Sequence, residues 1–256
     1  MTTIATWNVN SIRARLPHLT TWLAEAAPDV VGIQETKVQD PDFPLAELQA
    51  LGYHVLYSGQ KSYNGVAVLS KQPATLLATD IPGFADPQRR VLAAQVAGIT
   101  LLNLYVPNGS EVGSEKYSYK LAWLDALAQW VAQLVARGEP LALVGDFNIA
   151  PDDRDVHDPD AWRGKILCSD AERERLQRLI DSGLSDVFRQ FEQAPQSFSW
   201  WDYRGGGFRR NEGLRIDLIL TSAELAKRCE ACTVDLAPRR WEKPSDHAPV
   251  VARLQL

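Results

Sequence analysis

The chain has 256 residues, of which 45% are hydrophobic and 23% charged, and its 27 Lys and Arg stand against 32 Asp and Glu. This composition is typical of a globular protein and excludes disordered, collagen-like and coiled-coil chains. The net charge of −5 argues against a general electrostatic binder of polyanions. It does not exclude a nucleic-acid enzyme, because carboxylates around a metal would supply the excess of negative charge while basic residues cluster elsewhere. No repeat or Pro/Gly linker divides the sequence, so we expect one domain over residues 1–256.

Cysteine usage and the absence of targeting signals predict a reduced, cytoplasmic protein. Three cysteines are too few, and odd in number, for a disulfide framework. No apolar run approaches the roughly 20 residues of a membrane span, and the start lacks the pattern of a secretory signal. Cys229 and Cys232 match a CxxC pattern, but a zinc site needs about four ligands and a redox pair expects a helix start, so a structural role is favoured. We expect a monomer without membrane attachment.

Hydrophobic periodicity predicts alternating strands and helices along the chain. A strand at Ile4–Trp7 precedes a helix around residues 19–26, and the firmest helix, near residues 116–137, ends at Gly138. A capping box from Ser169 to Glu172 opens a third helix. The other predicted strands are Val30–Ile33, Val66–Leu69, Val91–Val96, Thr100–Tyr105, Leu141–Val144, Ile216–Leu220 and Val250–Leu254. Strands without intervening helices over residues 53–105 favour antiparallel pairing and two packed sheets flanked by helices.

Long irregular stretches are expected at residues 108–115, 151–168 and 203–215, and loops of that size are usually functional. The middle one is rich in aspartate, which suggests calcium binding. It lacks the glycine and the closing glutamate of a calcium loop, so a solvated acidic loop is favoured. Its aspartates are Asp152, Asp153, Asp155, Asp158 and Asp160.

Polar side chains stand where the apolar runs stop, at six predicted strand ends. A single Asp or Asn there is more often a turn former, but turns do not explain the whole set. No serine elbow, cysteine with an evident base or phosphate-binding glycine loop is present. Carboxylate and amide oxygens suit Mg²⁺ or Mn²⁺, and an Asp–His pair can position and deprotonate water, so the residue types indicate phosphodiester hydrolysis.

Six motifs, in order over nearly the whole chain, resemble the exonuclease III-type apurinic/apyrimidinic (AP) endonucleases of the endonuclease/exonuclease/phosphatase superfamily. The resemblance implies a four-layered α/β sandwich in which two mixed, largely antiparallel sheets pack between helices, with the active site at one end. It also implies a class II AP endonuclease that cleaves duplex DNA 5′ to abasic sites, with 3′–5′ exonuclease activity and trimming of blocked 3′ ends. The motifs are Trp7-Asn-Val-Asn-Ser, Gln34-Glu-Thr-Lys, Leu104-Tyr-Val-Pro-Asn-Gly, Gly145-Asp-Phe-Asn, Gly213-Leu-Arg-Ile-Asp and Lys243-Pro-Ser-Asp-His.

The resemblance further implies a Mg²⁺ or Mn²⁺ site with Glu35 as the principal ligand and with Asn8 and Asp246 beside the metal. Asn10 stands where some relatives have Asp, which leaves Glu35 with more of the binding.

The catalytic roles implied by the resemblance fall on five further residues. Asp146 would activate or orient the attacking water, and Asn148 would hold that water and a phosphate oxygen. Asp217 would fix the tautomer of His247, whose imidazolium contacts the scissile phosphate. Tyr105 would act as a hydrogen-bond donor or, with a lowered pKa, as a phenolate.

Substrate contacts are expected from a local basic surface and from an apolar pocket. The long loop at 203–215 carries several arginines beside Asp217, and phosphate contacts predict little sequence preference. Trp200, Leu214 and Ile216 match the apolar pocket of the AP endonucleases, which receives a flipped abasic sugar and excludes a base. The candidate DNA contacts are Arg13, Lys37, Asn64, Arg89, Arg204, Arg209 and Arg215.

Alternatives remain within and outside this branch. Relatives that cleave inositol phosphates or sphingomyelin, or that nick DNA as DNase I does, share the Glu, GDxN and SDH elements, but the Gln-Glu-Thr-Lys and Leu-Arg-Ile-Asp contexts favour the repair branch. A non-catalytic regulator on the same fold would have lost active-site groups, whereas every mapped position is filled by a competent residue.

Overall fold

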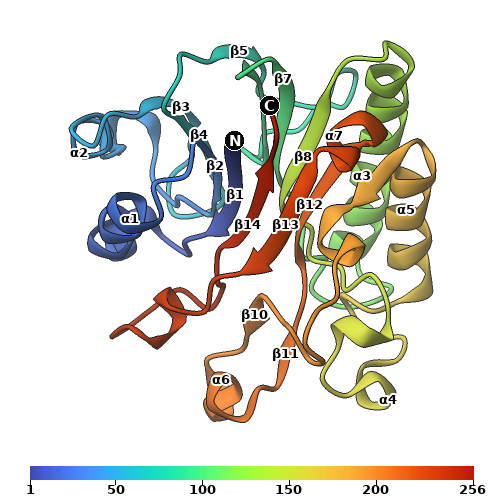
Figure 1. Cartoon of the computed structure of the whole chain (residues 1–256). Coiled ribbons are helices and arrows are strands. Elements are labelled where there is room, and N and C mark those ends of the chain that lie inside the picture. The colour runs from blue at the N-terminus through green and yellow to red at the C-terminus, as the bar shows by residue number, and fades with distance from the viewer.

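The computed structural model describes residues 1–256 and contains two six-stranded sheets that pack face to face (Figure 1). The first sheet, in spatial order, consists of β13 (Cys229–Val234), β14 (Val250–Leu254), β1 (Thr2–Asn8), β2 (Val30–Gln34), β4 (Val66–Ser70) and β3 (His54–Ser58). The second consists of β5 (Thr75–Ala78), β6 (Val91–Val96), β7 (Ile99–Tyr105), β8 (Leu141–Asp146), β12 (Asp217–Ser222) and β9 (Leu184–Asp186). β10 (Trp200–Trp201) and β11 (Gly213–Leu214) form a separate antiparallel pair.

Helices cover the outer face of each sheet, which makes four layers (Figure 1). α1 (Ile12–Ala26) and α2 (Leu45–Gln49) lie outside the first sheet, and α3 (Glu115–Ala136) and α5 (Asp170–Asp181) lie outside the second. The short helices α4 (Pro159–Trp162), α6 (Gly207–Arg210) and α7 (Ala223–Lys227) lie in the connections. The four-layered sandwich expected from the motifs is therefore confirmed. None of the helices combines the length and the apolar character needed to cross a bilayer.

The alternation of side chains along the strands builds three apolar layers. On β8, Ala142 and Val144 face the other sheet, whereas Leu141 and Leu143 pack beneath α3 and α5. On β1, Ile4 lies between the sheets and Trp7 packs against α1. Strands buried on both faces read as nearly continuous apolar runs, which explains why the sequence revealed them.

The strand pairing is mixed and largely antiparallel, as expected. β1 with β2 and β7 with β8 are parallel, while the other neighbours within the two sheets are antiparallel. The strands predicted from apolar runs and the three predicted helices are all present, and Ser169 and Glu172 form the expected capping box. The four edge strands β3, β5, β9 and β13 lie outside those runs because edges are partly exposed and lack a continuous apolar sequence.

A buried polar network joins the two sheets beside the strand ends that carry the site. Asn103 Nδ2 donates to the carbonyls of Ile33 (2.9 Å) and Ala67 (2.8 Å), and Gln34 Nε2 donates to Asn103 Oδ1 (2.7 Å). A Cβ atom on Gly32 would lie 2.7 Å from Asn103 Oδ1, so only glycine permits this close approach. The network holds β2 against β7, which brings the ends of these two strands together.

The aspartate-rich stretch at residues 151–168 is solvated at Asp153, Asp158 and Asp160, as expected from the sequence, but not at Asp155. Asp152 and Asp158 cap the short helices that begin at Asp153 and Pro159. Asp155 is fully buried and pairs with Arg189 and Arg215. The solvated-loop prediction is therefore wrong for Asp155, because its charge is neutralised by arginines that lie far away in the sequence. The stretch at residues 203–215 is likewise not irregular, since it contains α6 and β11.

The CxxC cysteines lie on the edge strand β13, and both are free thiols. Burial raises the pKa of the Cys232 thiol well above its ordinary value, which keeps it protonated. This placement supports the structural role favoured from the sequence.

Candidate active site

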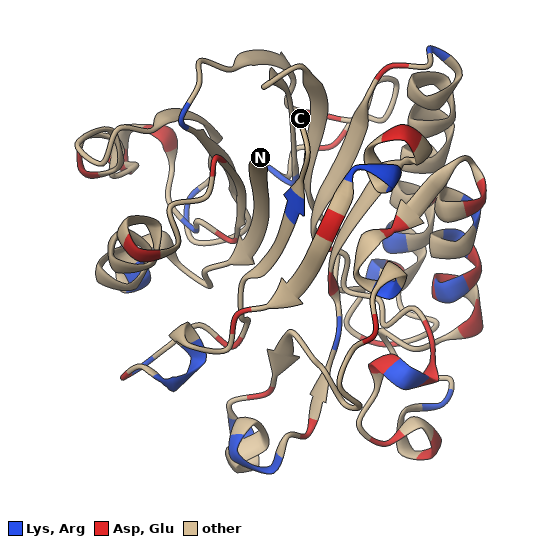
Figure 2. Cartoon of the chain, in the orientation of Figure 1, with Lys and Arg blue, Asp and Glu red and all other residues tan.

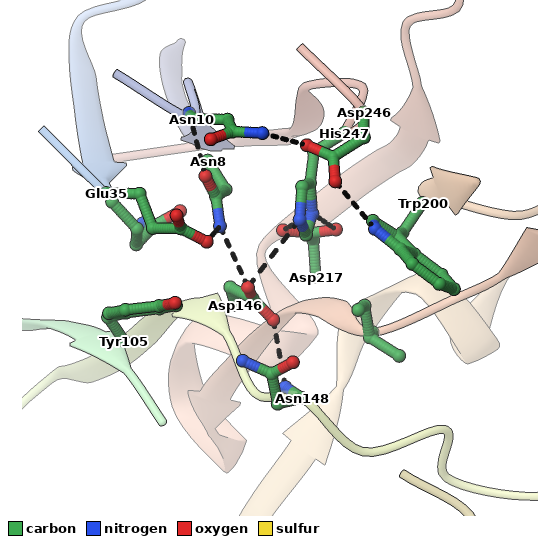
Figure 3. A network of polar contacts seen from close by, with 12 residues as sticks. Asn8, Asn10, Glu35, Tyr105, Asp146, Asn148, Trp200, Asp217, Asp246 and His247 are labelled. Atoms are coloured by element: carbon green, nitrogen blue, oxygen red, sulfur yellow. Dashed lines mark hydrogen bonds and ion pairs between the residues drawn. The ribbon is translucent and has the colours of Figure 1, made fainter. Parts of the chain in front are cut away.

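Six strand ends meet at one end of the sandwich and bring the predicted polar residues together (Figure 3). Asn8, Tyr105 and Asp146 are the last residues of β1, β7 and β8, and Glu35 directly follows β2. β12 and β14 run antiparallel to their neighbours β8 and β1, so their first residues reach the same edge. The remaining members of the set are Asn148, Asp217, Asp246 and His247.

Two carboxylates from different sheets share one amide donor. Asn8 Nδ2 donates to Glu35 Oε1 (2.9 Å) and to Asp146 Oδ2 (2.9 Å). Burial alone would raise the pKa of Glu35, but the Lys37 ammonium, 2.8 Å from Oε2, and the Asn8 amide lower it overall. Burial raises the pKa of Asp146 to about 7, with the negative charges of Asp217 and Glu35 acting in the same direction.

The donor set fits a divalent cation. Glu35 and Asp146 offer carboxylate oxygens, and these two oxygens and a ring nitrogen of His247 all lie within 4.8 Å of one another. A raised pKa at a buried carboxylate indicates negative charge that nearby cations do not balance, and an oxygen-rich site of this kind suits a hard metal ion.

Asp246 lies outside this compact group. Its Oδ1 accepts from Asn10 Nδ2 (3.0 Å) and its Oδ2 accepts from Trp200 Nε1 (3.0 Å), as Figure 3 shows. Of the three residues expected around a metal, Glu35 therefore lies in the cluster, Asn8 contacts two of its carboxylates, and Asp246 lies beside it.

Asp217 and His247 form a buried pair. His247 Nδ1 lies 2.8 Å from Asp217 Oδ2 and 3.1 Å from Oδ1, while its Nε2 lies 3.7 Å from Asp146 Oδ2. Burial disfavours the charged imidazole, but the carboxylates of Asp217 and Asp146 outweigh it and raise the pKa of His247 to about 10. The ring is therefore an imidazolium that faces the carboxylate cluster.

Asn148 is held beside Asp146 by its own backbone and by a neighbouring loop. Its N–H donates to Asp146 Oδ1 (2.9 Å), and its Nδ2 donates to the Val106 carbonyl (2.9 Å). Asn108 Nδ2 donates to Asn148 Oδ1 (3.2 Å). Burial and the charges of Glu35 and Asp146 raise the pKa of Tyr105 well above its ordinary value, which favours a neutral phenol.

The backbone around the site adopts a conformation that side chains usually avoid. Asn10, Glu35, Lys37 and Asn148 have φ values of 45°, 53°, 56° and 49°. Asn tolerates this left-handed region, but Glu and Lys rarely adopt it, and such strain persists where the surrounding structure enforces it.

The three predicted pocket residues belong to one apolar cluster beside the site, but two of them are covered. Leu214 and Ile216 are 0% and 1% exposed and pack with Val156 and Leu167, while Trp200 is only partly buried. Trp200 pairs with Leu214 across β10 and β11, forms a backbone bridge with His247, and donates from its indole N–H to Asp246 Oδ2 (3.0 Å). Of the three, only Trp200 is partly exposed.

The candidate DNA contacts differ in their accessibility. Arg13, Arg89, Arg204 and Arg209 are partly or fully exposed, and Figure 2 shows basic residues on α6 and on the nearby turn Pro238–Arg240. Lys37 lies inside the site, where it pairs with Glu35. Asn64 lines a polar cavity of about 450 Å³ that also includes Tyr105.

The prediction that Arg215 contacts DNA is wrong. Its side chain is 1% exposed, and its guanidinium pairs with Asp155 (2.6 Å) and Asp186 (2.7 Å) above the Phe188 ring. A guanidinium enclosed by two carboxylates and an aromatic ring does not reach a phosphate.

Two serines that sequence reasoning did not assign form hydrogen bonds with residues of the candidate site. Ser199 Oγ donates to Asp217 Oδ2 (2.6 Å) and accepts from the N–H of Asp217 (3.0 Å). Ser245 Oγ donates to the Asn8 carbonyl (2.7 Å). Ser245 belongs to the Ser-Asp-His motif, which offered a signal, whereas Ser199 lies in a stretch whose sequence shows no pattern.

Comparison with known proteins defines the class of protein. Residues 5–247 match the Endonuclease/Exonuclease/phosphatase family. The chain is 39% identical to exodeoxyribonuclease III of Haemophilus influenzae over 262 residues, which cover 97% of this chain and 98% of that protein. It is similar to an AP endonuclease structure from Archaeoglobus fulgidus (39% identity, TM-score 0.96, 100% of both chains). It is also similar to the 3′ phosphatase NExo from Neisseria bound to a product DNA hairpin (44% identity, TM-score 0.94, 100% of both chains).

The chain therefore belongs to the endonuclease/exonuclease/phosphatase family. Its relatives confirm the resemblance drawn from the six motifs: within this family it is an exonuclease III-type AP endonuclease, a hydrolase of DNA repair.

Proposed function

We propose that the protein is a Mg²⁺- or Mn²⁺-dependent class II AP endonuclease that cleaves duplex DNA 5′ to abasic sites, and that the same site acts as a 3′–5′ exonuclease and removes 3′-blocking groups. The observation that carries this proposal is the pair of carboxylates bridged by Asn8 opposite the Asp217–His247 pair. One side of the site then suits a cation, and the other presents an imidazolium to a phosphate.

Glu35, with Asn8 and Asp246 beside it, would hold the metal. A bound divalent ion would neutralise charge on the phosphate and polarise its oxygens. Glu35 suits this role because its pKa is lowered, which keeps the carboxylate charged.

Asp146 would accept a proton from the attacking water. A pKa of about 7 suits a general base near neutral pH, and Asn148, tied to Asp146 through its backbone N–H, would orient the water. The water oxygen attacks phosphorus as its proton passes to Asp146, and the bond to the 3′ oxygen of the preceding nucleotide breaks. That oxygen takes up a proton from solvent, which leaves a 3′ hydroxyl and a 5′-phosphate.

His247 would stabilise the negative charge that develops on the phosphate. Asp217 keeps the imidazole charged and orients it, so the ring needs no reorganisation during the reaction. The raised pKa of Tyr105 supports a role as a phenolic hydrogen-bond donor rather than as a phenolate.

Substrate recognition would combine phosphate contacts with the wall formed by Trp200. Exposed arginines on α6 and near α1, with Lys37, Asn64 and Arg89, are proposed to contact the duplex backbone with little sequence preference. Trp200, Leu214 and Ile216 are proposed to receive the abasic sugar. We further propose that the chain acts in the cytoplasm as a single-domain monomer on chromosomal DNA.

A second candidate is an enzyme confined to 3′ ends. The observation in its favour is that Leu214 and Ile216 are covered by neighbouring apolar side chains, which leaves a flipped sugar less room. A 3′ terminus needs no extrusion of a nucleotide from the helix.

The deciding experiment uses three matched labelled duplexes: one with an internal abasic site, one intact, and one with a 3′-phosphate at a nick. With Mg²⁺ we expect incision 5′ to the abasic site and removal of the 3′-phosphate, and with EDTA neither. Phosphate removal without incision would establish the second candidate. Activity that persists in EDTA would overturn both.

A further inference from the structure

A lysine beneath the phosphate site is buried completely and contacts the loops that carry two of the polar side chains there. Lys120 lies on α3 and its side chain is 0% exposed. Its Nζ donates to the Asn148 carbonyl (2.6 Å), to the Asn108 carbonyl (3.1 Å) and to Glu172 Oε1 (2.5 Å). All three hydrogens of the ammonium are thus used.

Glu172, on α5, uses both of its oxygens. Oε1 also accepts from the Leu167 N–H (3.1 Å), and Oε2 accepts from the N–H (3.1 Å) and hydroxyl (2.6 Å) of Ser169. The carboxylate is 0% exposed, so the ion pair lies wholly inside the protein. Three donors besides the ammonium therefore set the orientation of the carboxylate, and the carboxylate in turn sets the position of the ammonium.

Burial of such a pair is not an efficient way to gain stability. The desolvation of two charges offsets their attraction, and apolar residues of similar volume often stabilise a protein equally well. Burial lowers the pKa of Lys120 although Glu172 acts in the opposite direction, which shows that the charge lies in an unfavourable environment. The pair must therefore be explained by what it holds in place.

The ammonium contacts the backbone of both asparagine loops. Asn148 has a φ of 49°, and its amide oxygen accepts from Asn108 (3.2 Å). A Cβ atom on Gly109 would lie 3.1 Å from Lys120 Cδ, so the loop after Asn108 packs directly on the lysine stem. With both carbonyls fixed by one ammonium, the two asparagine side chains have a defined separation beside Asp146.

We propose that Lys120 is a positioning residue of the active site: its ammonium fixes the Asn108–Asn148 pair against the reacting phosphate, and Glu172 keeps the ammonium in that place. This inference deepens the proposed function and rests on the role given there to Asn148. A displacement of about 1 Å in a water-orienting group costs roughly 10²-fold in rate, so the effect should appear in kcat rather than in KM.

The chain offers a matched control between the same two helices. Arg175 Nη2 on α5 pairs with Asp125 Oδ2 on α3 (3.0 Å), and Arg175 Nε donates to the Leu121 carbonyl (3.3 Å). This pair joins the helices but contacts neither asparagine loop. Arg175→Met/Asp125→Asn should leave kcat unchanged.

The test compares Lys120→Met/Glu172→Gln with the control and with wild type. The double variant removes both charges together. The amide oxygen introduced by Glu172→Gln can replace Oε2, which accepts from the N–H and hydroxyl of Ser169, whereas the Leu167 N–H loses its acceptor. The donors to the asparagine carbonyls are lost, and thermal unfolding checks that the variant is folded. We expect kcat to fall roughly 10- to 100-fold with little change in KM, on both abasic and 3′-phosphate duplexes.

A merely structural lysine is recognised by a double-mutant cycle. In an Asn148→Ala background, a positioning residue has little left to position, so the further loss should be under about threefold. An equal loss in both backgrounds, or wild-type kcat in the double variant, overturns the proposal. If the double variant does not fold, Lys120→Gln/Glu172→Gln, which leaves no unpaired buried charge, replaces it in the same cycle with the same criteria. If Asn148→Ala itself retains wild-type kcat, it is the proposed function that fails.

Discussion

Disruption of the Asp217–His247 pair should show that the two residues act as one catalytic unit. Their charged atoms lie 2.8 Å apart, and both side chains are at most 4% exposed. At an effective dielectric constant of about 20, opposite unit charges at this distance attract by about 6 kcal/mol, which sets the ceiling for what Asp217 contributes. Asn at position 217 would keep an acceptor for Ser199 but lose the charge that holds His247 as an imidazolium.

We expect Asp217→Asn to lower single-turnover kcat by about 10²- to 10³-fold, or about 3–4 kcal/mol, which lies below that ceiling. His247→Asn removes the imidazolium itself and should cost at least as much. The double variant should lose little more than His247→Asn alone, because without the imidazole Asp217 has nothing to orient.

The assay is incision of an abasic duplex at saturating Mg²⁺, with thermal unfolding to confirm that each variant is folded. Losses that multiply in the double variant would refute the idea of a single unit. Full activity in folded Asp217→Asn would mean that this carboxylate serves only the structure of β12.

Three further predictions follow from the site and its surroundings. Glu35→Ala should shift the Mg²⁺ dependence to much higher concentration and lose most of the rate at low Mg²⁺ without unfolding the protein; wild-type activity at low Mg²⁺ would contradict the assignment. Trp200→Ala should weaken the preference for abasic over intact duplex, whereas Trp200→Phe, which loses the hydrogen bond to Asp246 but keeps an aromatic wall, should keep most of it; an unchanged preference in the alanine variant would place the pocket elsewhere. Arg215→Met should lower the free energy of unfolding in urea by about 3–5 kcal/mol, because Asp155 and Asp186 lose their buried partner, whereas Arg209→Met should reduce the salt dependence of DNA binding. A stable Arg215→Met variant with a reduced salt dependence would restore Arg215 as a DNA contact.

The residues of the site were predictable because chemistry restricts them to a few types at recognisable places. Asn8, Glu35, Asp146 and Asp217 interrupt or follow apolar runs where a strand has no need for a charge, and a metal-assisted hydrolysis requires carboxylates and amides. The central strands were predictable for a related reason, since burial on both faces demands continuous apolar sequence. Sequence by itself therefore determined the sheet-forming core and the chemical class of the site.

Tertiary structure decided which of these groups contact one another. The sequence could not show that Asp146, rather than Asp246, joins Glu35 and His247 in the compact cluster, because that choice depends on how the two sheets pack through Asn103. It assigned Arg215 to the surface because a charge in a glycine- and arginine-rich stretch is usually solvated, whereas distant carboxylates enclose it. The burial of Lys120 could not be predicted from the sequence either. Helical spacing gives its position on α3, but the asparagine loops that cover its side chain come from other parts of the chain. Local sequence specifies residue type and periodicity, but the partners of a buried charge come from segments remote in the chain, and only the packed structure brings them together.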